Sequence, residues 1–545
     1  MRLVVIGHGM VGARLIDEVR RHDPQGRDIA ITVLGAEVHD PYNRVLLSDV
    51  VAGRVELGAL RLPADNRERV LVLAGAAAVS IDRDERMVQD SDGARHPYDV
   101  VVLATGAAAV IPPIPGLPSN PLLDPPVAGI HVLRDLDDAR ALVAAGSNAR
   151  RAAVVGAGVL GIEVACGLAA RGLQVTLVGR GRVMDRQLDA AADSAMRVAL
   201  DKAGVAQAHG RLLRVGTQRD RVSALEVDDE HLSADLLVFA CGTRPRTELA
   251  AHAGLPVRRG VLVGPDLASP RDPRIFAIGD CAQPPGGATG LVWQGWDQAR
   301  ALAARLAASA GERHAPASAD GPGPDARPPA RDAPAGRGAT ASIAGWDVDH
   351  PATDQAVVTV KADKLVTVAM GAAGALHRTG DRRLVLSDPD AGRHIEIAVR
   401  GDRLVGAVCI GDASLAADLT AAFTRATPVP PDPALLLVRQ VPGLSRGGAD
   451  PAALTKMPNR TVICRCNGVS KGSLLDCWRR GARTAQEVAE RTRATTGCGT
   501  CTDTITDILT WAEQAEGGQQ RDASPPTGLG ADQGANTPET LRTHS

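Results

Sequence analysis

"RLVVIGHGMVGARLIDEVRR", residues 2–21, decides the fold of the first part of this chain. A short apolar strand leads into Gly7, Gly9 and Gly12, after which apolar residues recur at helical spacing. Glycines at these positions permit a tight turn, let a pyrophosphate approach the backbone, and allow the helix to pack closely on the strand. The N-terminus of the helix faces the bound anion with unpaired N–H groups. The stretch therefore predicts a Rossmann-like dinucleotide-binding fold.

A second strand, "DIAITVLG" at residues 28–35, extends this unit. Glu37 follows it, where a carboxylate accepts hydrogen bonds from the ribose of a bound dinucleotide. The adenosine half of either FAD or NAD fits such a position.

The same pattern returns in the middle of the chain, within residues 153–182. Gly156, Gly158 and Gly161 follow a second apolar strand, and Glu163 lies two residues beyond the last glycine. This repeat predicts a second dinucleotide site.

The end of the strand after this second fingerprint distinguishes the two nicotinamide coenzymes. An NAD site places Asp or Glu there to bind the ribose 2'-OH, whereas this chain has Gly179. Arg180 and Arg182 follow, and a guanidinium pairs well with a 2'-phosphate. The sequence predicts NADPH as coenzyme. The alternative is NADH bound without an acidic contact, with both arginines on the surface.

Two further segments carry a family resemblance. "DVVVLATGA" at 99–107 and "DPRIFAIGDCA" at 272–282 resemble signatures of the FAD-dependent pyridine-nucleotide oxidoreductases, flavoproteins with two dinucleotide-binding domains. In that family the ATG turn, here Thr105 and Gly106, passes close to FAD. The Asp of the second signature, here Asp280, binds the ribityl chain.

"PYNRVLLSD" at 41–49 resembles the segment that wraps FAD in the same family. The resemblance implies that Arg44 and Ser48 contact the pyrophosphate or the isoalloxazine ring. The alternative for Arg44 is a solvated surface arginine. Relatives often carry a lysine directly after the serine, where this chain has Asp49. Hydride transfer to a flavin requires no acid or base, so we expect no catalytic side chain.

The order of these segments implies an α/β fold class with two Rossmann-like dinucleotide-binding domains, a small α+β domain and a small helical iron–sulfur module with four cysteines. Residues 308–342 and 516–545 contain many Pro, Gly and polar residues, a composition that favours disorder. The expected parts are an FAD-binding domain at 1–113 and 245–307, an inserted NAD(P)-binding domain at 114–244, a disordered linker at 308–342, a reductase C-terminal-like α+β domain at 343–440, an iron–sulfur domain at 458–515 and a disordered tail at 516–545.

Four of the 9 cysteines lie close together late in the chain. They form a C-x-C and a C-x-x-C pair, and they are Cys464, Cys466, Cys498 and Cys501. Four thiolates suit a structural zinc ion or an iron–sulfur cluster, and ligand count does not decide between them. The other five are scattered and are expected to be small buried hydrophobic residues.

The stretch from Ile463 to Cys501 resembles the bacterioferritin-associated-ferredoxin-like module, which binds a 2Fe-2S cluster through such pairs. Cofactor chemistry favours the same choice over zinc. Nicotinamide gives two electrons as a hydride, a cluster takes one at a time, and a flavin can do both.

Charge and hydropathy exclude two classes of partner. The net charge of -2 and the pI near 6.7 give no broad attraction to nucleic acid or to a membrane surface. No apolar run approaches the roughly 18 residues of a membrane span. The chain opens on a strand instead of a secretory leader, so we expect a cytoplasmic protein.

The domain order resembles the N-terminal half of the large subunit of NAD(P)H nitrite reductase, and the electron-transfer subunit of assimilatory nitrate reductase. This implies a reductase that passes electrons from NAD(P)H through FAD and a 2Fe-2S cluster to a separate nitrate or nitrite reductase subunit. One alternative is a reductase of ferredoxin or rubredoxin. Another is a non-catalytic, zinc-stabilised protein that senses redox state. The resemblance also allows a homodimer.

Overall fold

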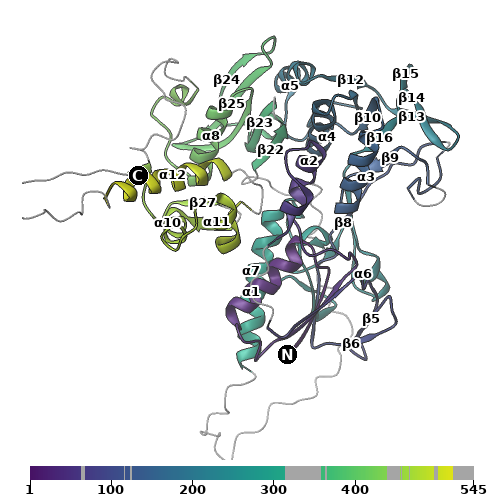
Figure 1. Ribbon diagram of the computed structural model, residues 1–545, viewed down its shortest axis with the longest axis vertical. Helices are drawn as coiled ribbons and strands as arrows, with labels where there is room; N and C mark the ends of the chain where they lie inside the picture. Colours follow the sequence, from purple (N-terminus) through teal and green to yellow (C-terminus); the bar gives the residue numbers. More distant parts are fainter. Residues whose placement is uncertain are drawn as a thin grey trace, which may run out of the picture. The chain divides into compact units, whose positions relative to one another are not determined.

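A computed structural model describes residues 1–62, 68–115, 117–122, 126–312, 357–362, 365–437, 454–455, 457–464, 467–495 and 501–519 (Figure 1). The chain divides into two compact units. The first contains Met1–Ser445 and the second contains Arg446–Thr495 and Thr500–Ser545. Within the described residues, no helix combines the length and the apolar character needed to cross a membrane.

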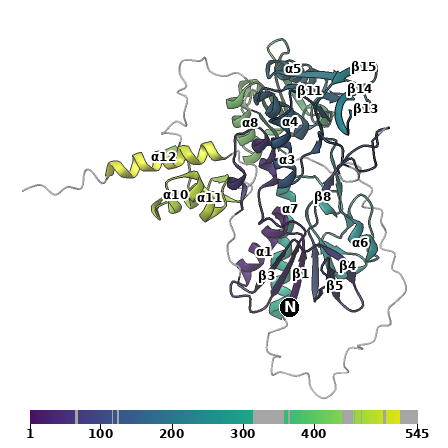
Figure 2. The same ribbon diagram turned by 45° about the vertical axis from the view of Figure 1, so that its right-hand side comes forward.

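The first domain is built on a six-stranded sheet with the strand order β19-β20-β7-β1-β2-β3. Residues Leu3–Ile6 are all buried, as expected for a parallel strand covered on both faces. Helices α1 and α7 pack together against one face (Figures 1 and 2). The elements are β1 (Arg2–Ile6), α1 (Met10–His22), β2 (Ala30–Gly35), β3 (Val70–Ala74), β7 (Val100–Leu103), β19 (Ala268–Ser269), β20 (Asp272–Ala277) and α7 (Val292–Glu312).

Smaller elements surround this sheet. A three-stranded antiparallel sheet has the order β4-β5-β6, and α6 packs on β4. The turn that follows β2 carries two short helices, η1 and α2. Their bounds are η1 (Arg44–Leu46), α2 (Leu47–Val51), η2 (Leu57–Leu60), β4 (Ala78–Asp82), β5 (Met87–Asp90), β6 (Arg95–Pro97), α6 (Glu248–His252), β18 (Val261–Leu262), η3 (Gly279–Cys281) and β21 (Ala282–Gln283).

The second domain repeats the parallel architecture in a five-stranded sheet of order β12-β11-β10-β16-β9. An antiparallel sheet of β13, β14 and β15 extends from it. The elements are β9 (Ile130–Val132), α3 (Leu136–Gly146), β10 (Arg151–Val155), α4 (Val159–Ala170), β11 (Gln174–Gly179), α5 (Ala190–Lys202), β12 (Val205–His209), β13 (Leu212–Gln218), β14 (Arg221–Val227), β15 (Glu230–Ser233) and β16 (Leu236–Phe239).

Two antiparallel strands join the two domains. The chain leaves the first domain through β8 (Ala107–Ala109) and returns through β17 (Thr243–Pro245), which pairs with β8. The second domain is therefore an insertion in the first.

The third domain is a five-stranded antiparallel sheet of order β22-β23-β26-β25-β24 with one helix against it. Helix α8 begins at the cap Asp412, whose side chain accepts a hydrogen bond of 2.9 Å from the backbone N–H of Leu415. Strands followed by a helix agree with the expected α+β domain. The bounds are β22 (Val357–Ala362), β23 (Leu365–Gly371), η5 (Gly374–Leu376), β24 (Arg382–Asp388), β25 (Arg393–Arg400), β26 (Arg403–Ile410), α8 (Ala413–Arg425) and η6 (Pro433–Leu436).

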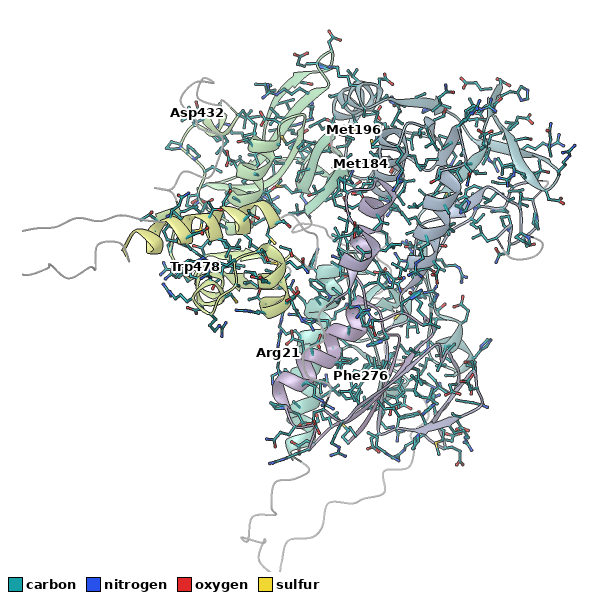
Figure 3. All side chains as sticks on the ribbon, in the orientation of Figure 1. Arg21, Met184, Met196, Phe276, Asp432 and Trp478 are labelled. Atoms are coloured by element: carbon teal, nitrogen blue, oxygen red, sulfur yellow. The ribbon has the colours of Figure 1, made fainter. Side chains whose placement is uncertain are left out.

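One hydrophobic core runs through all three domains of the first unit. It joins Leu47 of α2, Met184 and Met196 of the inserted domain, and Val360 and Val408 of the third domain. Figure 3 labels Met184 and Met196 in this region. Because apolar side chains of all three domains share this core, their mutual placement is part of one packed body.

The second unit is a small helical module. Its helices pack around Leu474, Cys477, Val488, Ile505 and Ile508. A capping box of Thr484 and Glu487 begins α11. The elements are β27 (Val462–Cys464), β28 (Val469–Ser470), α10 (Lys471–Arg479), α11 (Ala485–Thr492) and α12 (Thr502–Gln519).

Helices α7 and α12 extend into the first residues of the two segments predicted to be disordered. Helix α7 continues to Glu312 because Leu306 and Ala310 are buried, so residues 308–312 are helical and not linker. Helix α12 likewise continues to Gln519, beyond the expected start of the tail at residue 516. Residues 313–342 and 520–545 lie outside the described part of the chain.

Candidate functional site

The first glycine fingerprint forms the turn between β1 and α1. Gly7 has a φ of 111°, and a Cβ there would lie 2.2 Å from the carbonyl oxygen of Ala104. A Cβ on Gly12 would lie 2.1 Å from the carbonyl oxygen of Gly7. Larger side chains cannot fit at either position. Gly9 is the N-cap of α1. The atoms nearest to a Cβ placed on Gly9 would be two nitrogens of the Arg44 guanidinium, at 3.8 and 3.9 Å. The N-terminus of α1 therefore faces a cationic group, as a phosphate site requires.

Glu37 and Arg44, both predicted to contact FAD, form an ion pair with each other. The Tyr42 hydroxyl donates a 2.7 Å hydrogen bond to Glu37 and accepts one of 2.9 Å from the backbone N–H of Leu136. Burial opposes ionisation of Glu37, but Arg44 and Tyr42 outweigh it and lower the pKa of this carboxyl. Glu37 is therefore an anion about one third exposed, with its side chain 34% accessible.

Two further arginines, Arg134 and Arg246, lie beside Arg44 of this pair. The guanidinium of Arg44 donates to the carbonyl oxygen of Arg134 at 3.1 Å. Burial and the positive charges of Arg44 and Arg134 lower the pKa of Arg246, and the nearby Glu37 and Asp135 only partly offset this effect in the arginine cluster. A pyrophosphate carries the charge that would neutralise it. The residues present therefore fit the diphosphate of a dinucleotide. Sequence reasoning missed Arg134 and Arg246, because each follows a short strand that has no motif of its own.

Thr105, Gly106 and Asp280 lie at the same edge of the first sheet. Thr105 follows β7, and its hydroxyl donates to the carbonyl oxygen of Arg246 at 3.1 Å. A Cβ on Gly106 would meet nothing within 4 Å, so the space in front of this turn is open. Asp280 lies in η3 and pairs with Arg134 at 2.6 Å. The predicted FAD residues of four separate segments are thus brought together.

The second fingerprint has the same geometry. Gly156 has a φ of 117°, and a Cβ there would lie 2.3 Å from the carbonyl oxygen of Ala240. A Cβ on Gly161 would lie 1.8 Å from the carbonyl oxygen of Gly156. Gly158 caps α4, and a Cβ there would meet nothing within 4 Å. The protein leaves this position open to a ligand.

Gly179, Arg180 and Arg182 lie beside that opening. A Cβ on Gly179 would lie 2.9 Å from the Cβ of Ala157, inside the second fingerprint, so a carboxylate residue at this position would require the turn to shift. Arg180 and Arg182 are both exposed. The geometry therefore leaves no acid at position 179 next to the fingerprint, and two exposed arginines follow this position in the chain.

Ser48 and Glu163, predicted to contact different cofactors, contact each other. The Ser48 hydroxyl donates to a Glu163 carboxylate oxygen at 2.6 Å, and both residues are buried. Burial raises the pKa of Glu163 despite the nearby Lys361 ammonium. The pair joins α2 of the first domain to α4 of the second.

A small pocket of about 170 Å³ opens between α4, the start of α7 and the third domain. Its walls are mainly apolar and include Val159, Leu291, Val358, Met370 and Leu376. This volume is below the range of about 300–1,000 Å³ that is usual for a whole ligand, so the pocket suits only one apolar edge of a larger bound group.

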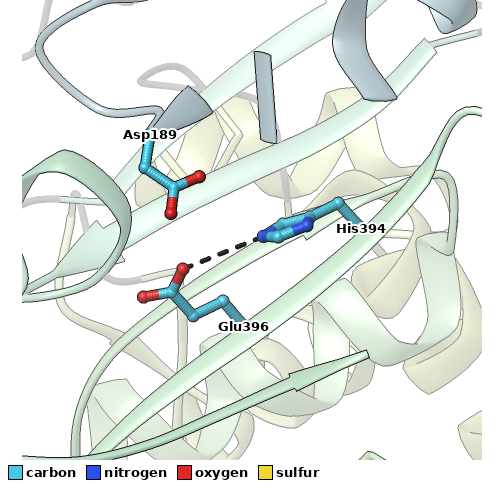
Figure 4. Close-up of side chains that lie close together, drawn as sticks. All are labelled: Asp189, His394 and Glu396. Carbon is cyan, nitrogen blue, oxygen red and sulfur yellow. Dashed lines mark ion pairs between the residues drawn. The ribbon is translucent and has the colours of Figure 1, made fainter. Parts of the chain in front are cut away.

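Asp189, His394 and Glu396 form a separate cluster between α5 and the third domain, in which His394 and Glu396 are buried and Asp189 is half-buried (Figure 4). His394 Nε2 lies 3.8 Å from Glu396 Oε2, beyond the length of a good hydrogen bond. The Arg383 guanidinium contacts both carboxylates, and its distance to Glu396 is 2.7 Å. Because Arg383 already supplies the cation between the two acids, we interpret the cluster as an ion-pair network and not as a metal site.

In the second unit, two of the four predicted cluster ligands lie together. Cys464 ends β27 and Cys501 precedes α12, and both are buried. A hydrogen bond from the Cys501 thiol outweighs burial and lowers the pKa of Cys464 to about 6. The Asn467 amide also donates to Cys464 Sγ, at 3.8 Å. An environment that stabilises a thiolate fits a metal or cluster ligand. Cys466 and Cys498 lie outside the described residues.

The remaining cysteines agree with their expected role as small hydrophobic residues. Four are buried and Cys241 is partly buried. The four are Cys166, Cys281, Cys409 and Cys477.

Comparison with known proteins tests the resemblance. The family of pyridine nucleotide-disulphide oxidoreductases matches residues 1–303, and the BFD-like [2Fe-2S] binding domain matches residues 462–511. Nitrite reductase [NAD(P)H] of Bacillus subtilis (strain 168) is 28% identical over 515 residues, which cover 93% of this chain and 57% of that protein. The assimilatory nitrate reductase electron transfer subunit of the same strain is 28% identical over 523 residues, covering 94% and 60%. The chain thus spans less than two thirds of either relative.

Among solved structures, the covalent putidaredoxin reductase–putidaredoxin complex has a TM-score of 0.63 and 23% identity, covering 81% of this chain and 96% of that one. This likeness shows the fold alone and confirms the predicted fold class. The family matches also confirm an oxidoreductase with FAD and NAD(P)H as cofactors, and they support the iron–sulfur cluster over zinc. The chain therefore belongs to the pyridine nucleotide-disulphide oxidoreductase family and carries a BFD-like [2Fe-2S] binding domain.

Proposed function

We propose that this chain is an NADPH-dependent flavo-iron–sulfur reductase that delivers electrons to a separate nitrate or nitrite reductase subunit. The observation that carries the proposal is the presence, in one chain, of two glycine fingerprints, the second of them open at Gly158, and a pair of hydrogen-bonded thiols. Bound FAD would accept a hydride from the nicotinamide and release its electrons singly. The similarity to the two nitrite and nitrate reductase proteins over more than nine tenths of the chain supports the choice of acceptor.

The residues of the chain would bind and position the cofactors. The N-terminus of α1 and the arginines 44, 134 and 246 would hold the FAD pyrophosphate, and Glu37 would accept hydrogen bonds from its ribose. The small apolar pocket beside Val159 and Val358 would keep water from one edge of the rings. Cys464, Cys466, Cys498 and Cys501 would hold the cluster.

NADPH is proposed as coenzyme because of the open space at Gly158 and the exposed guanidinium groups of Arg180 and Arg182. The 2'-phosphate would pair with these arginines. The measurement is kcat/KM for NADPH and NADH in the wild type and in an R180A/R182A double variant. We expect the NADPH value to fall roughly tenfold or more, with little change for NADH. R211A/R214A, which removes two other exposed arginines of the same domain, is the matched control.

The electron acceptor is tested with the anaerobic, purified chain. NADPH oxidation is followed with nitrate plus a candidate nitrate reductase subunit, with nitrite plus a candidate nitrite reductase subunit, and with a soluble ferredoxin or rubredoxin alone. Reduction of nitrate or nitrite that requires both proteins supports the proposal. Rapid reduction of ferredoxin or rubredoxin and no turnover with either subunit would favour the alternative reductase.

A cytoplasmic location is consistent with the free thiol state of every described cysteine.

A further inference from the structure

Lys361 of β22 contacts the first and second domains through its side chain and its backbone. Its backbone N–H donates to Glu163 Oε1 at 2.9 Å, and its carbonyl oxygen accepts from the Arg54 guanidinium at 3.0 Å. Its ammonium lies 3.0 Å from Asp49 Oδ2 and 3.2 Å from Ser48 Oγ. One residue of the third domain is therefore fixed to α4 of the second domain and to α2 of the first.

Lys361 forms a cluster with Ser48, Asp49, Arg54 and Glu163, and its ammonium is a countercharge for the two buried carboxylates. The Asp49 and Glu163 side chains are only 9% and 5% exposed, and the ammonium lies within 4 Å of both, 3.7 Å from Glu163 Oε2. The second cation beside them, Arg54, pairs with Asp49 at 2.6 Å. Without the Lys361 ammonium, Glu163 would keep its hydrogen bonds from the Ser48 hydroxyl and from the backbone N–H of residue 361, but it would lose the cation beside it. Buried charges of like sign repel, so removal of this cation weakens the contact between α2 and α4.

The cluster lies directly behind the wall of the apolar pocket. Val159, one helical turn before Glu163 on α4, lines the pocket, and so does Val358, three residues before Lys361 on β22. The same two elements that Lys361 joins therefore supply opposing parts of the pocket lining. A small shift between them changes the shape of the pocket without unfolding either domain.

We propose that Lys361 is a positioning residue for the transfer between nicotinamide and flavin, an inference that rests on the proposed function. By joining α2, α4 and β22, Lys361 fixes the segment predicted to wrap FAD against the helix that follows the second fingerprint, and so sets how the two rings can align. The rate of hydride transfer depends steeply on the alignment of the two rings. The binding of the coenzyme phosphates at the two fingerprints does not depend on that alignment. The third domain thereby takes part in the reductive half-reaction and is not only a support for the other two.

The test is rapid-mixing measurement of flavin reduction by NADPH in full-length K361M, which keeps the length of the side chain and removes the charge. We expect the maximal reduction rate to fall on the order of tenfold to a hundredfold, while the NADPH concentration at half-maximal rate changes less than about threefold. FAD content and reduction by dithionite should stay at the wild-type level, because neither requires alignment of a nicotinamide.

Two further variants separate positioning from general stability. K361R keeps the charge and should recover most of the rate. K202M is the matched control, because Lys202 of α5 also reaches the third domain. Its Nζ lies 2.7 Å from the carbonyl oxygen of Ala391, and its contacts in the third domain are to backbone carbonyl oxygens. It should leave the rate within about twofold of wild type.

If K361M does not fold, E163Q weakens the same cluster with little change of shape and should lower the maximal rate in the same way. An unchanged maximal rate in K361M, or in E163Q where K361M does not fold, would overturn the inference, as would an equal loss in K202M. A wild-type protein without FAD, or one that NADPH does not reduce, would instead contradict the proposed function.

Discussion

Arg134 donates a 2.6 Å charged hydrogen bond to Asp280, although the two residues are 146 positions apart in the chain. Arg134 follows β9 of the inserted domain, whereas Asp280 lies in η3 of the first domain. A second bond, from Arg134 Nε to the carbonyl oxygen of Ala107 at 2.9 Å, fixes the guanidinium beside the strand that leaves the first domain. The inserted domain thus supplies a cation to the predicted FAD site.

The first prediction follows from that contact. Arg134→Gln removes one of three clustered positive charges and the charged bond to Asp280, so FAD should bind more weakly. Hydrogen bonds to charged groups contribute about 1.5–3 kcal/mol, which corresponds to a loss of FAD affinity of roughly tenfold to a hundredfold. The measurement is titration of flavin-free protein with FAD. Arg140→Gln is the control, because the Arg140 side chain is 50% exposed and its partner Asp137 is exposed as well. Equal affinities in wild type and R134Q would remove Arg134 from the site.

The second prediction contrasts two glycines of one turn. Gly158→Ala places a methyl group in open space, so the protein should fold with its normal stability. The KM for NAD(P)H should rise at least roughly tenfold, because the methyl group occupies the space through which the pyrophosphate approaches the backbone. Gly161→Ala places a Cβ 1.8 Å from the carbonyl oxygen of Gly156 and should lower stability by about 1–3 kcal/mol. Thermal unfolding and coenzyme kinetics of both variants check the contrast. A destabilised G158A with normal KM would contradict it.

The glycine positions were predictable from sequence because their constraints are local. Gly7 and Gly12 lie five residues apart, and the contact that forbids a Cβ on Gly12 is the carbonyl of Gly7 itself. The sequence also predicted that Cys464 and Cys501 belong to one set of four cluster ligands, because the two pairs of cysteines have the spacing of a known module; the structure brings these two described members together. Such patterns depend only on residues within one short segment or one small domain.

Arg134, Arg246 and Lys361 were not predictable, because each acts on a segment far away in the chain. No spacing rule relates Lys361 to Glu163, which lies 198 positions earlier, or to Asp49, 312 positions earlier. The sequence did show that a lysine expected after Ser48 is replaced by Asp49. Only the fold shows that an ammonium group reaches this place from the third domain.

The third prediction concerns the thiols. Cys501→Ser removes a predicted cluster ligand, so iron and acid-labile sulfide should fall to near background, while reduction of FAD by NADPH continues because the two dinucleotide sites lie in the first unit. Metal analysis with zinc measured alongside, together with paramagnetic resonance after reduction, gives the result. Cys477→Ser is the control, since Cys477 is buried in the same unit and accepts a hydrogen bond of 3.7 Å from Arg480. Full iron content in C501S, or a stoichiometric zinc ion in the wild type, would contradict the cluster assignment.

The fourth prediction is a pH-dependent loss of stability in Arg383→Met. Burial would raise the pKa of Glu396, but the neighbouring His394 and Arg383 outweigh it, so the folded pKa lies below the unfolded value of about 4.3. The stability that Glu396 contributes is therefore present above pH 4.3 and is lost as the pH falls through the folded pKa. Without Arg383 this carboxylate is a buried charge that lacks its cation. Breaking a buried pair costs about 3–5 kcal/mol, which we lower to about 1–3 kcal/mol because the Arg383 side chain is 36% exposed.

The difference between wild type and R383M in the free energy of unfolding should therefore be largest near neutral pH. It should shrink as the pH falls from about 4.3 through the lower folded-state pKa of Glu396, because the carboxylate that Arg383 stabilises is then protonated. Denaturant titrations at several pH values measure this difference. Arg382→Met is the matched control, because Arg382 belongs to the same strand and its pair with Asp432 is exposed, with atoms 3.9 Å apart. A difference that is constant across pH would show that Arg383 acts through packing instead of charge, and the ion-pair interpretation of the cluster would then be wrong.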